Sequence, residues 1–414
     1  MFFFYQILII VIIILSPIIL LVRLFKKKEH PIRFKEKFSI HSKSRPKGNL
    51  IWFHGASVGE ILSIIPLVEK LEKNKDIKTI LITSSTVSSA IVYKQHKSKK
   101  TIHQFFPIDS YLFTNKFLKY WQPSIAIFVD SEIWPNMYLN IKKENITLLL
   151  LNARITKKSF EKWSIFKKFS QSVFNKIDIA YPQNKETLNY LKRLNVSKIK
   201  KIGNLKFSEG IYDSSKEIGL NLKNFLSDKM YWCASSTHEG EELIAAKAHL
   251  ILKKKIKNLI LIVIPRNVQR VTKITNMLSK LGLKTHLHSL NQKIPENTNV
   301  YIVDEYGETK SFFKICKVIF LGKSLTLDGG QNPLEPARYN CNIVHGPNVS
   351  NFHEIYNLLG KSKITFRINN QNQLIKKINE LLKRNIGSKN VGNRINKIGK
   401  KILNKTLIEI KKFI

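Results

Sequence analysis

A loop near the start of the chain, His54–Glu60, ends in a carboxylate that could act as a base. The loop follows the apolar run Leu50–Phe53 and precedes apolar residues at helical spacing, so it should join a strand to a helix. Its two glycines would let a ligand approach the backbone, and a carboxylate facing a cleft at a helix start can serve as a general base. Glu60 also stands three residues after Ser57, the spacing of a capping box. The residues alone support the catalytic and the capping interpretation of Glu60 equally.

Two more loops in the first half of the chain carry charged residues after apolar runs. Asp130–Asn136 contains the acids Asp130 and Glu132 at a predicted helix start, where the helix dipole favours negative charge. Solvated helix-start acids are therefore the default interpretation of both. The segment Gly203–Phe207 contains Lys206, which could face a phosphate or a sugar carboxylate. A single Lys in a Lys-rich chain is usually a surface residue, so this segment is a weak signal by itself.

Two loops in the second half have residues suited to phosphate. Ala234–Glu242 offers hydroxyls and backbone N–H groups at a helix start, which can bind phosphate, although capping by Thr237 would explain the same residues. Pro265–Arg270 follows another apolar run. Its Arg266 could grip a phosphate through two parallel hydrogen bonds.

The longest loop signal is Gly322–Ala337. Capping explains part of it, since Asn332 suits the N-cap, Pro333 the first helical position and Glu335 the third. Capping does not explain the pair Gly329-Gly330 or the length of the loop. A flexible turn that binds a nucleotide at the helix start is the favoured interpretation.

Short apolar runs that alternate with amphipathic stretches would position these loops. The first set of predicted strands is Leu50–Phe53, Ile80–Ile82, Ile125–Val129, Leu148–Leu151 and Ile177–Tyr181. The pattern pauses near Ser208–Ser227, and the second set is Met230–Ala234, Leu259–Ile264, Val300–Val303, Val318–Leu321 and Ile343–His345. Repeated βα units imply parallel sheets covered on both faces. We expect an α/β protein with two Rossmann-like, doubly wound domains that face a cleft, divided near residue 210 into 23–210 and 211–414, with ligands at the carboxyl ends of the strands.

The segment Met1–Val22 is almost wholly apolar and long enough to cross a bilayer as a helix. It has no basic residue before Arg23 and no small-residue cleavage site, unlike a secretory signal peptide. Basic residues follow at once at Arg23 and Lys26–Lys28, and such flanks stay in the cytoplasm. We expect residues 1–22 to be a single-pass anchor in the inner membrane, with the rest of the chain on the cytoplasmic face. A shallow insertion that does not span the bilayer, helped by a kink at Pro17, is the alternative.

Composition limits the other possibilities. Lys and Arg number 70 against 29 Asp and Glu, a net charge of +41 that would attract nucleic acid, anionic lipid or phosphorylated ligands. The excess is spread along the whole chain, which favours a compositional habit over a dedicated surface. Three cysteines without a CxxC pair argue against a disulfide framework or a zinc site. There is also no Asp/His cluster with metal-ligand spacing, so we expect no bound metal and no other cofactor.

Seven segments, in order, resemble the Kdo (3-deoxy-D-manno-octulosonic acid) transferase family over nearly the whole chain. They are IWFHGASVGE, PSIAIFVDSEIWPN, LNARITKKS, GNLKF, ASSTHEGEE, IPRNVQR and GGQNPLEPARYNCNIVHGPNVSNFHEI. The resemblance implies a GT-B glycosyltransferase that transfers Kdo from CMP-Kdo, as a donor substrate, to a lipid A precursor (lipid IVA) in lipopolysaccharide biosynthesis. The first domain would then bind the acceptor and the second CMP-Kdo, and anionic inner-membrane lipids would be a further partner.

The resemblance also implies roles for individual residues. Glu60 matches the catalytic base of an inverting displacement, and Glu132 and Lys206 match positions that stabilise the transition state. The matches to CMP contacts are Pro265, Arg266, Gly307, Glu308, Thr309, Asn332, Pro333, Leu334 and Glu335. This chain departs from the family where it has PRNVQR for PRHPER, GKSL for GGSL and GGQNPLEPA for GGHNPLEPA.

Two other functions remain open at this stage. One is a membrane-surface GT-B enzyme with a different sugar nucleotide, which a donor screen would distinguish. The other is a basic nucleic-acid-binding protein. No RNA-binding signature supports the second, so nucleic acid is not an expected partner.

Overall fold

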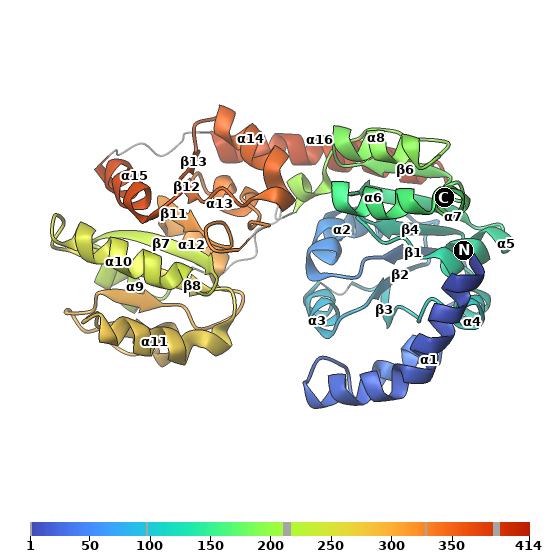
Figure 1. Ribbon diagram of the computed structural model, residues 1–414, viewed down its shortest axis with the longest axis horizontal. Helices are drawn as coiled ribbons and strands as arrows, with labels where there is room; N and C mark the ends of the chain where they lie inside the picture. The colour runs from blue at the N-terminus through green and yellow to red at the C-terminus, as the bar shows by residue number, and fades with distance from the viewer. Residues whose placement is uncertain (1, 97, 210–216, 328, 384–389) are drawn as a thin grey trace. The chain divides into compact units, whose positions relative to one another are not determined.

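The structure is a computed structural model that describes residues 2–96, 98–209, 217–327, 329–383 and 390–414. The chain divides into two compact units. Unit 1 consists of Met1–Tyr212 together with Ile398–Ile414, and unit 2 of Asp213–Lys397. Each unit has a parallel sheet with helices on both faces (Figure 1).

Unit 1 is built on a six-stranded parallel sheet in the order β3-β2-β1-β4-β5-β6. The strands are β1 (Leu50–His54), β2 (Thr79–Ser84), β3 (Thr101–Phe105), β4 (Ile125–Val129), β5 (Thr147–Ala153) and β6 (Ile179–Pro182). The helices are α1 (Phe2–Phe25), α2 (Val58–Leu71), α3 (Val87–Gln95), α4 (Tyr111–Trp121), α5 (Pro135–Lys143), α6 (Lys157–Ile165), α7 (Lys167–Phe174) and α8 (Lys185–Arg193), with 3₁₀ turns η1 (Arg33–Phe38) and η2 (Leu205–Ser208). The strand order reverses between β1 and β4, and ligands of such sheets bind outside the carboxyl ends at this point.

Unit 2 has a seven-stranded parallel sheet in the order β13-β12-β11-β7-β8-β10-β9. The strands are β7 (Met230–Thr237), β8 (Leu259–Pro265), β9 (Thr285–Leu287), β10 (Val300–Ile302), β11 (Val318–Leu321), β12 (Asn342–His345) and β13 (Thr365–Arg367). The helices are α9 (Leu220–Leu226), α10 (Glu241–Lys253), α11 (Val271–Lys280), α12 (Thr309–Ile315), α13 (Leu334–Arg338), α14 (His353–Lys361) and α15 (Gln371–Lys383), with η3 (Val268–Arg270), η4 (His288–Leu290) and η5 (Ser350–Phe352). Here the order reverses between β7 and β11.

Every strand predicted from the sequence is present, because strands buried on both faces appear as continuous apolar runs. The sequence did not predict β3, β9 and β13. Strand β3 contains three buried polar residues. Thr101 accepts from the Tyr93 hydroxyl at 3.0 Å, His103 Nε2 lies 2.8 Å from Ser84 Oγ, and Gln104 accepts from the Trp121 indole at 3.1 Å. This strand can be buried although its sequence is not apolar, because hydrogen bonds satisfy its polar side chains.

The last helix, α16 (Val391–Lys411), corrects one predicted boundary. The sequence prediction assigned all of 211–414 to the second domain, whereas Ile398–Ile414 belongs to unit 1. Lys200 pairs with Glu409 at 2.5 Å, and a Cβ at Gly399 would lie 2.0 Å from the Phe207 carbonyl oxygen. The periodicity of an amphipathic helix defines its apolar face but not the core against which that face packs.

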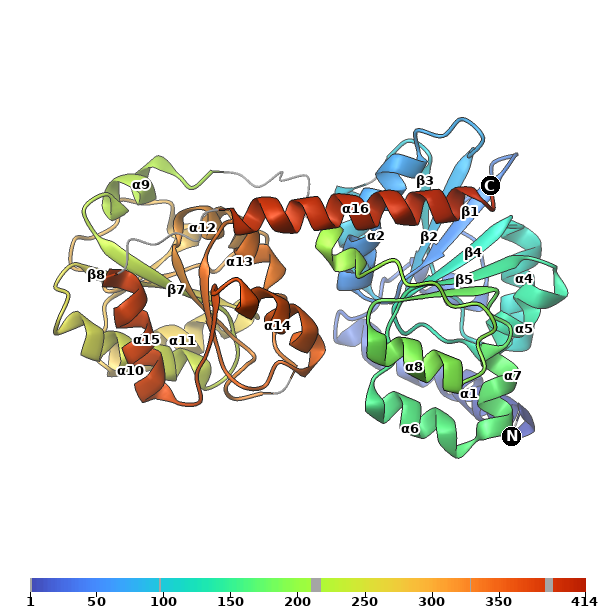
Figure 2. The same ribbon diagram turned by 90° about the horizontal axis from the view of Figure 1, so that it is seen from above.

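Helix α1 is the one helix among the described residues that is long and apolar enough to cross a membrane, with 24 residues and a mean hydropathy of 3.1 over an 18-residue stretch. It runs along the outside of unit 1, and its N-terminal end lies beside α5 and α7 (Figures 1 and 2). The rings of Phe2 and Tyr5 lie 6.0 and 5.9 Å from that of Phe169 in α7. Most of the other α1 side chains are exposed.

Candidate active site

The reversal of strand order in unit 1 brings together residues that are far apart in the sequence. His54 ends β1, and Glu60 lies in the first turn of α2, which follows it. Asp130 and Glu132 directly follow β4, the neighbour of β1. Three carboxylates and an imidazole therefore meet at the place where a doubly wound sheet binds ligands.

The surroundings of Glu60 are compatible with both of the interpretations that the sequence left open. It forms a capping box with Ser57, and its carboxylate accepts from the Ala56 N–H at 2.6 Å and from the Ser57 hydroxyl at 2.9 Å. Burial, followed by the negative charges of Glu132 and Asp130, nevertheless raises the pKa of Glu60 to about 7. A carboxyl group with a pKa near neutrality is suited to exchange a proton at physiological pH.

Glu132 is held in its ionised form by neighbouring side chains. Its Oε2 lies 3.1 Å from His54 Nε2 and accepts from the Trp134 indole at 2.9 Å. Burial acts to raise the pKa of Glu132, but these hydrogen bonds and the nearby His54 outweigh it and bring the pKa below its usual value. Its side chain is only 13% exposed, so the interpretation as a solvated helix-start acid is wrong.

Asp130 was also interpreted as a solvated acid, and it is instead buried. Its backbone has a φ of 64°, in the left-handed region that non-glycine residues rarely adopt. The Asp130 carboxylate lies 3.6 Å from Lys206 Nζ, and the Lys206 side chain is only 16% exposed. Burial raises the pKa of Asp130, while the positive charges of Lys206 and Arg154 oppose that shift. Lys206 is thus largely buried beside Asp130 rather than a solvated surface lysine.

Polar side chains fix the backbone on which Lys206 stands. Asn204 Oδ1 accepts from the Lys206 N–H at 3.0 Å, and Asn152, at the end of β5, accepts from the Leu205 N–H at 2.9 Å. Gly203 has a φ of 130°, and a Cβ there would lie 2.8 Å from the Ile402 side chain. A glycine is therefore required at this position, because another residue would be strained at this φ and would clash with Ile402.

Sequence reasoning missed His54 and Asp130 as site residues. Each is a polar residue at the end of a buried strand, and this is the signal that could have identified them. The contact of His54 with Glu132 depends on β1 and β4 being neighbours, although β2 and β3 separate them along the chain. The contact of Asp130 with Lys206 joins segments separated by β5 and β6.

In unit 2, the residues that match CMP contacts lie at or after the carboxyl ends of three strands of the one sheet, β8, β10 and β11. Pro265 ends β8 and Arg266 follows it, Gly307 and Glu308 lie between β10 and α12, which begins at Thr309, and Asn332–Glu335 follow β11. Arg266 is exposed and, with Lys323, lowers the pKa of His238, whose own burial is the larger cause. These loops share one edge of the sheet, as the sequence predicted.

The start of α13 is shifted by one residue from the prediction. Pro333 is the N-cap residue, whereas Asn332 was the expected one; the Asn332 side chain still accepts from the Leu334 N–H at 3.1 Å. Helix α13 has only five residues, so its dipole is a weaker source of anion binding than expected. Gly329 and Gly330 have φ values of 115° and 67°, which explains the glycine pair that capping left unexplained.

Glu241 is a buried carboxylate that organises this edge of unit 2, and the sequence did not single it out. Its two oxygens accept from the N–H groups of His238, Lys323, Ser324 and Leu325 at 2.7 to 3.1 Å. A Cβ at Gly322 would lie 2.7 Å from this carboxylate. Glu241 thus ties the loop after β7 to the loop after β11.

The sequence of residues 32–209 matches the family model described as 3-deoxy-D-manno-octulosonic-acid transferase (kdotransferase). A 3-deoxy-D-manno-octulosonic acid transferase of Rickettsia bellii is 33% identical over 361 residues, which cover 87% of this chain and 86% of the relative. The chain belongs to the Kdo transferase family. The enzyme of the same name from Haemophilus influenzae is 28% identical over 90% of this chain and 87% of its own length. This Kdo transferase family member is thus a glycosyltransferase.

Solved structures support the fold of the transferase. A UDP-GlcNAc 2-epimerase from Neisseria meningitidis aligns with a TM-score of 0.60 over 88% of this chain and 99% of its own, at 13% identity. At that identity the likeness concerns the fold alone, the two Rossmann-like domains of the GT-B class.

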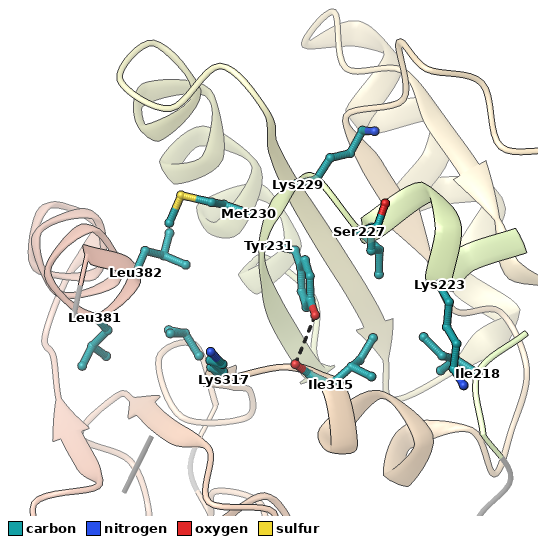
Figure 3. A pocket seen from close by; sticks show the side chains of 12 residues that line it. Ile218, Lys223, Ser227, Lys229, Met230, Tyr231, Ile315, Lys317, Leu381 and Leu382 are labelled. Atoms are coloured by element: carbon teal, nitrogen blue, oxygen red, sulfur yellow. Dashed lines mark hydrogen bonds between the residues drawn. The ribbon is translucent and has the colours of Figure 1, made fainter. Parts of the chain in front are cut away.

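A separate cavity of about 410 Å³ lies at the opposite edge of the unit 2 sheet (Figure 3). It is lined by the amino-terminal ends of β7 and β11, including Met230 and Tyr231, and by Leu381 and Leu382 of α15. Because ligands of doubly wound sheets bind at the carboxyl ends, we do not assign the donor of the transferase to this cavity.

Within the described ranges, no group of three or more His, Cys, Asp or Glu residues could hold a metal ion. The three cysteines of the transferase, Cys233, Cys316 and Cys341, are free thiols buried in the core of unit 2.

Proposed function

We propose that this protein transfers Kdo from CMP-Kdo to a lipid A precursor, with Glu60 as the general base. One observation carries the proposal: in a member of this family, Glu60 lies at the reversal point of unit 1 beside Glu132 and Asp130 and has a pKa of about 7. Lipid IVA, the acceptor that the sequence resemblance implies, is our choice of substrate for the test.

The proposed reaction is a single displacement with inversion at the anomeric carbon of Kdo. Glu60 takes the proton from an acceptor hydroxyl, the oxygen forms the new glycosidic bond, and the bond to the CMP phosphate breaks with both electrons leaving on CMP. Glu132 is ionised by its contacts with His54 and Trp134, so it can stabilise developing positive charge at the sugar carbon. Lys206 can stabilise developing negative charge.

The pKa of Glu60 predicts the pH dependence of this reaction. A general base must be deprotonated, so kcat/KM should fall about tenfold for each pH unit below about 7 and level off above it. Replacing Glu132 with glutamine removes a charge that raises the pKa of Glu60. The midpoint of the pH profile of kcat/KM should therefore lie at lower pH in Glu132→Gln than in the wild type, whatever the maximal rate of the variant. Profiles of kcat/KM between pH 5 and pH 9 would measure both; an identical midpoint in the variant would contradict the assignment of Glu60.

We propose that the donor binds at the carboxyl edge of the unit 2 sheet, where Arg266 would contact the phosphate and Glu335 the ribose hydroxyls. Removing a hydrogen bond to a charged group costs about 1.5–3 kcal/mol. Arg266→Ala and Glu335→Ala should therefore each weaken CMP binding about tenfold or more in calorimetric titrations. Arg394→Ala, which removes an exposed arginine of α16 within unit 2, should leave the affinity unchanged. Unchanged affinity in both test variants would place the nucleotide elsewhere.

We also propose that the enzyme works at the cytoplasmic face of the inner membrane. The exposed apolar surface of α1 would contact lipid, and the basic residues Arg23 and Lys26–Lys28 after it would attract anionic headgroups. A lipid acceptor gives a reason for a two-domain α/β enzyme to carry such a helix.

The direct test is mass spectrometry of products from CMP-Kdo and lipid IVA. A mass increase of one or more Kdo residues supports the proposal and also counts the units added. No product with CMP-Kdo, together with transfer from another sugar nucleotide, would support the alternative of a GT-B enzyme with a different donor.

A further inference from the structure

A network of hydrogen bonds joins the N-terminal turn of α1 to the start of α5. The Tyr5 hydroxyl donates to Asp109 Oδ2 at 2.5 Å, and the Gln6 side-chain amide donates to Asn136 Oδ1, also at 2.5 Å. The Asn136 side chain donates in turn to the Asp109 carbonyl oxygen at 2.6 Å. Tyr5 and Gln6, the only polar side chains in the first two turns of α1, thus point toward the rest of unit 1 and not toward lipid.

Asp109 supplies the cap that α5 requires. The N-cap residue of α5 is Trp134, whose side chain has no acceptor for the first N–H groups of the helix, so these need an acceptor from elsewhere. Asp109 accepts from the N–H of Asn136 at 3.0 Å and from that of Met137 at 2.8 Å, as a capping carboxylate would. It is only 2% exposed, and that burial raises its pKa to about 6 against the opposing hydrogen bonds.

Residues of α5 and its N-cap hold both the backbone and the side chain of Glu132. Tyr138 of α5 donates its hydroxyl to the Glu132 carbonyl oxygen at 2.8 Å, and Trp134 donates to the Glu132 carboxylate at 2.9 Å. A displacement of the first turn of α5 would therefore move Glu132 relative to His54 and Glu60.

The contact between Tyr5 and Asp109 also indicates how α1 is oriented relative to the membrane. The hydrocarbon core is about 30 Å thick, so in a spanning helix Tyr5 would lie on the far side from Asp109. In the structure both ends of α1 contact unit 1, because Arg23 at the other end pairs with Glu29 at 3.0 Å, and Glu29 with Lys37 at 2.6 Å. Between these ends the helix exposes an apolar surface suited to lipid: Ile7, Leu8, Ile10, Val11, Ile14, Leu15, Ile18 and Ile19.

We propose that α1 lies along the membrane surface and that Asp109 is a positioning residue through which α1 holds the Glu132 loop in place. The membrane-bound helix would then set the geometry of the site as well as its location. The lipid-facing part of the inference is independent of the reaction. The positioning role rests on the proposed function of Glu60 and Glu132.

The positioning role is tested by Tyr5→Phe, which removes one hydroxyl and keeps the ring packed on Phe169. We expect kcat to fall about tenfold with unchanged CMP affinity, together with a lower melting temperature, because a hydrogen bond to a charged acceptor also stabilises the folded state. Because the charge of Glu132 raises the pKa of Glu60, the pH profile should also shift to lower pH. The control is Tyr120→Phe, which removes a hydroxyl that donates to the Lys43 carbonyl in the same unit, and its kcat and profile should not change. A Tyr5→Phe enzyme with wild-type kcat and pH profile would overturn the positioning role.

The path of α1 is tested by cross-linking in native membranes, which requires no activity. A short bismaleimide should join the thiols of the double variant Phe2→Cys/Phe169→Cys within one chain, because the two rings that they replace lie 6.0 Å apart and are partly exposed. It should not join those of Ile14→Cys/Phe169→Cys, in which the first thiol lies on the exposed surface of α1 about three turns further along. The three native thiols are buried. If the first pair fails to cross-link although both thiols react with a monofunctional maleimide in detergent, α1 crosses the membrane and the inference is wrong, even where Kdo transfer is observed.

Discussion

Replacing Glu60 with glutamine is expected to lower kcat by at least about 10²-fold, the lower bound for loss of a general base. CMP affinity should not change, since the proposed nucleotide contacts are all in unit 2. The fold should also be retained, because the glutamine carbonyl oxygen can still accept from the Ala56 N–H that the carboxylate contacts now. Steady-state kinetics with CMP-Kdo and lipid IVA would give kcat, and calorimetry with CMP would give the affinity.

The matched control separates catalysis from capping. Ser57→Ala removes the other half of the capping box and leaves the Glu60 carboxylate in place. It should cost about 0.5–2 kcal/mol of stability, as loss of an N-cap does, with most of the turnover retained. If Glu60→Gln instead keeps near-wild-type turnover and loses only stability, like Ser57→Ala, then Glu60 is a cap and another base must be sought.

The sequence was sufficient for the two sheets because fully buried parallel strands are the simplest pattern to detect. Ile125–Val129 and Val318–Leu321 were predicted with their observed bounds, while Thr101–Phe105 was not, since its interior residues are polar and paired. The assignment of Ile398–Ile414 was wrong for a related reason: it depends on packing partners such as Phe207, which lie far away in the sequence.

The candidate site shows the same division between local and non-local information. The capping box of Glu60 is local and was recognised from its spacing, but its raised pKa arises from Glu132 and Asp130 across the β1–β4 junction. The burial of Asp130 and its contact with Lys206 also join segments separated by β5 and β6. Charged residues at strand ends could be enumerated from the sequence. Which of them meet is decided by strand order.

Lys206→Met is expected to lower kcat by about 10²–10³-fold, the loss measured when one preorganised electrostatic group is removed from a site. Methionine has a similar length and no charge, so it tests the ammonium group with little change in packing. The variant has a second consequence, because Asp130 would be left buried without its partner at 3.6 Å. Breaking a buried ion pair by removing one partner typically costs about 3–5 kcal/mol, so the single variant should also melt at a lower temperature.

The double variant Lys206→Met/Asp130→Asn distinguishes these two effects. An asparagine at position 130 carries no charge that needs a partner, so the melting temperature should recover most of the loss seen in the single variant. Activity should remain low, because the ammonium group that stabilises negative charge in the transition state is still missing. Asp130→Asn alone provides the reference: it removes one of the charges that raise the pKa of Glu60, and its pH profile should therefore shift to lower pH while Lys206 remains. If the double variant regains turnover together with stability, Lys206 serves only as the counter-ion of Asp130, and the negative charge that develops during transfer must be stabilised by other groups.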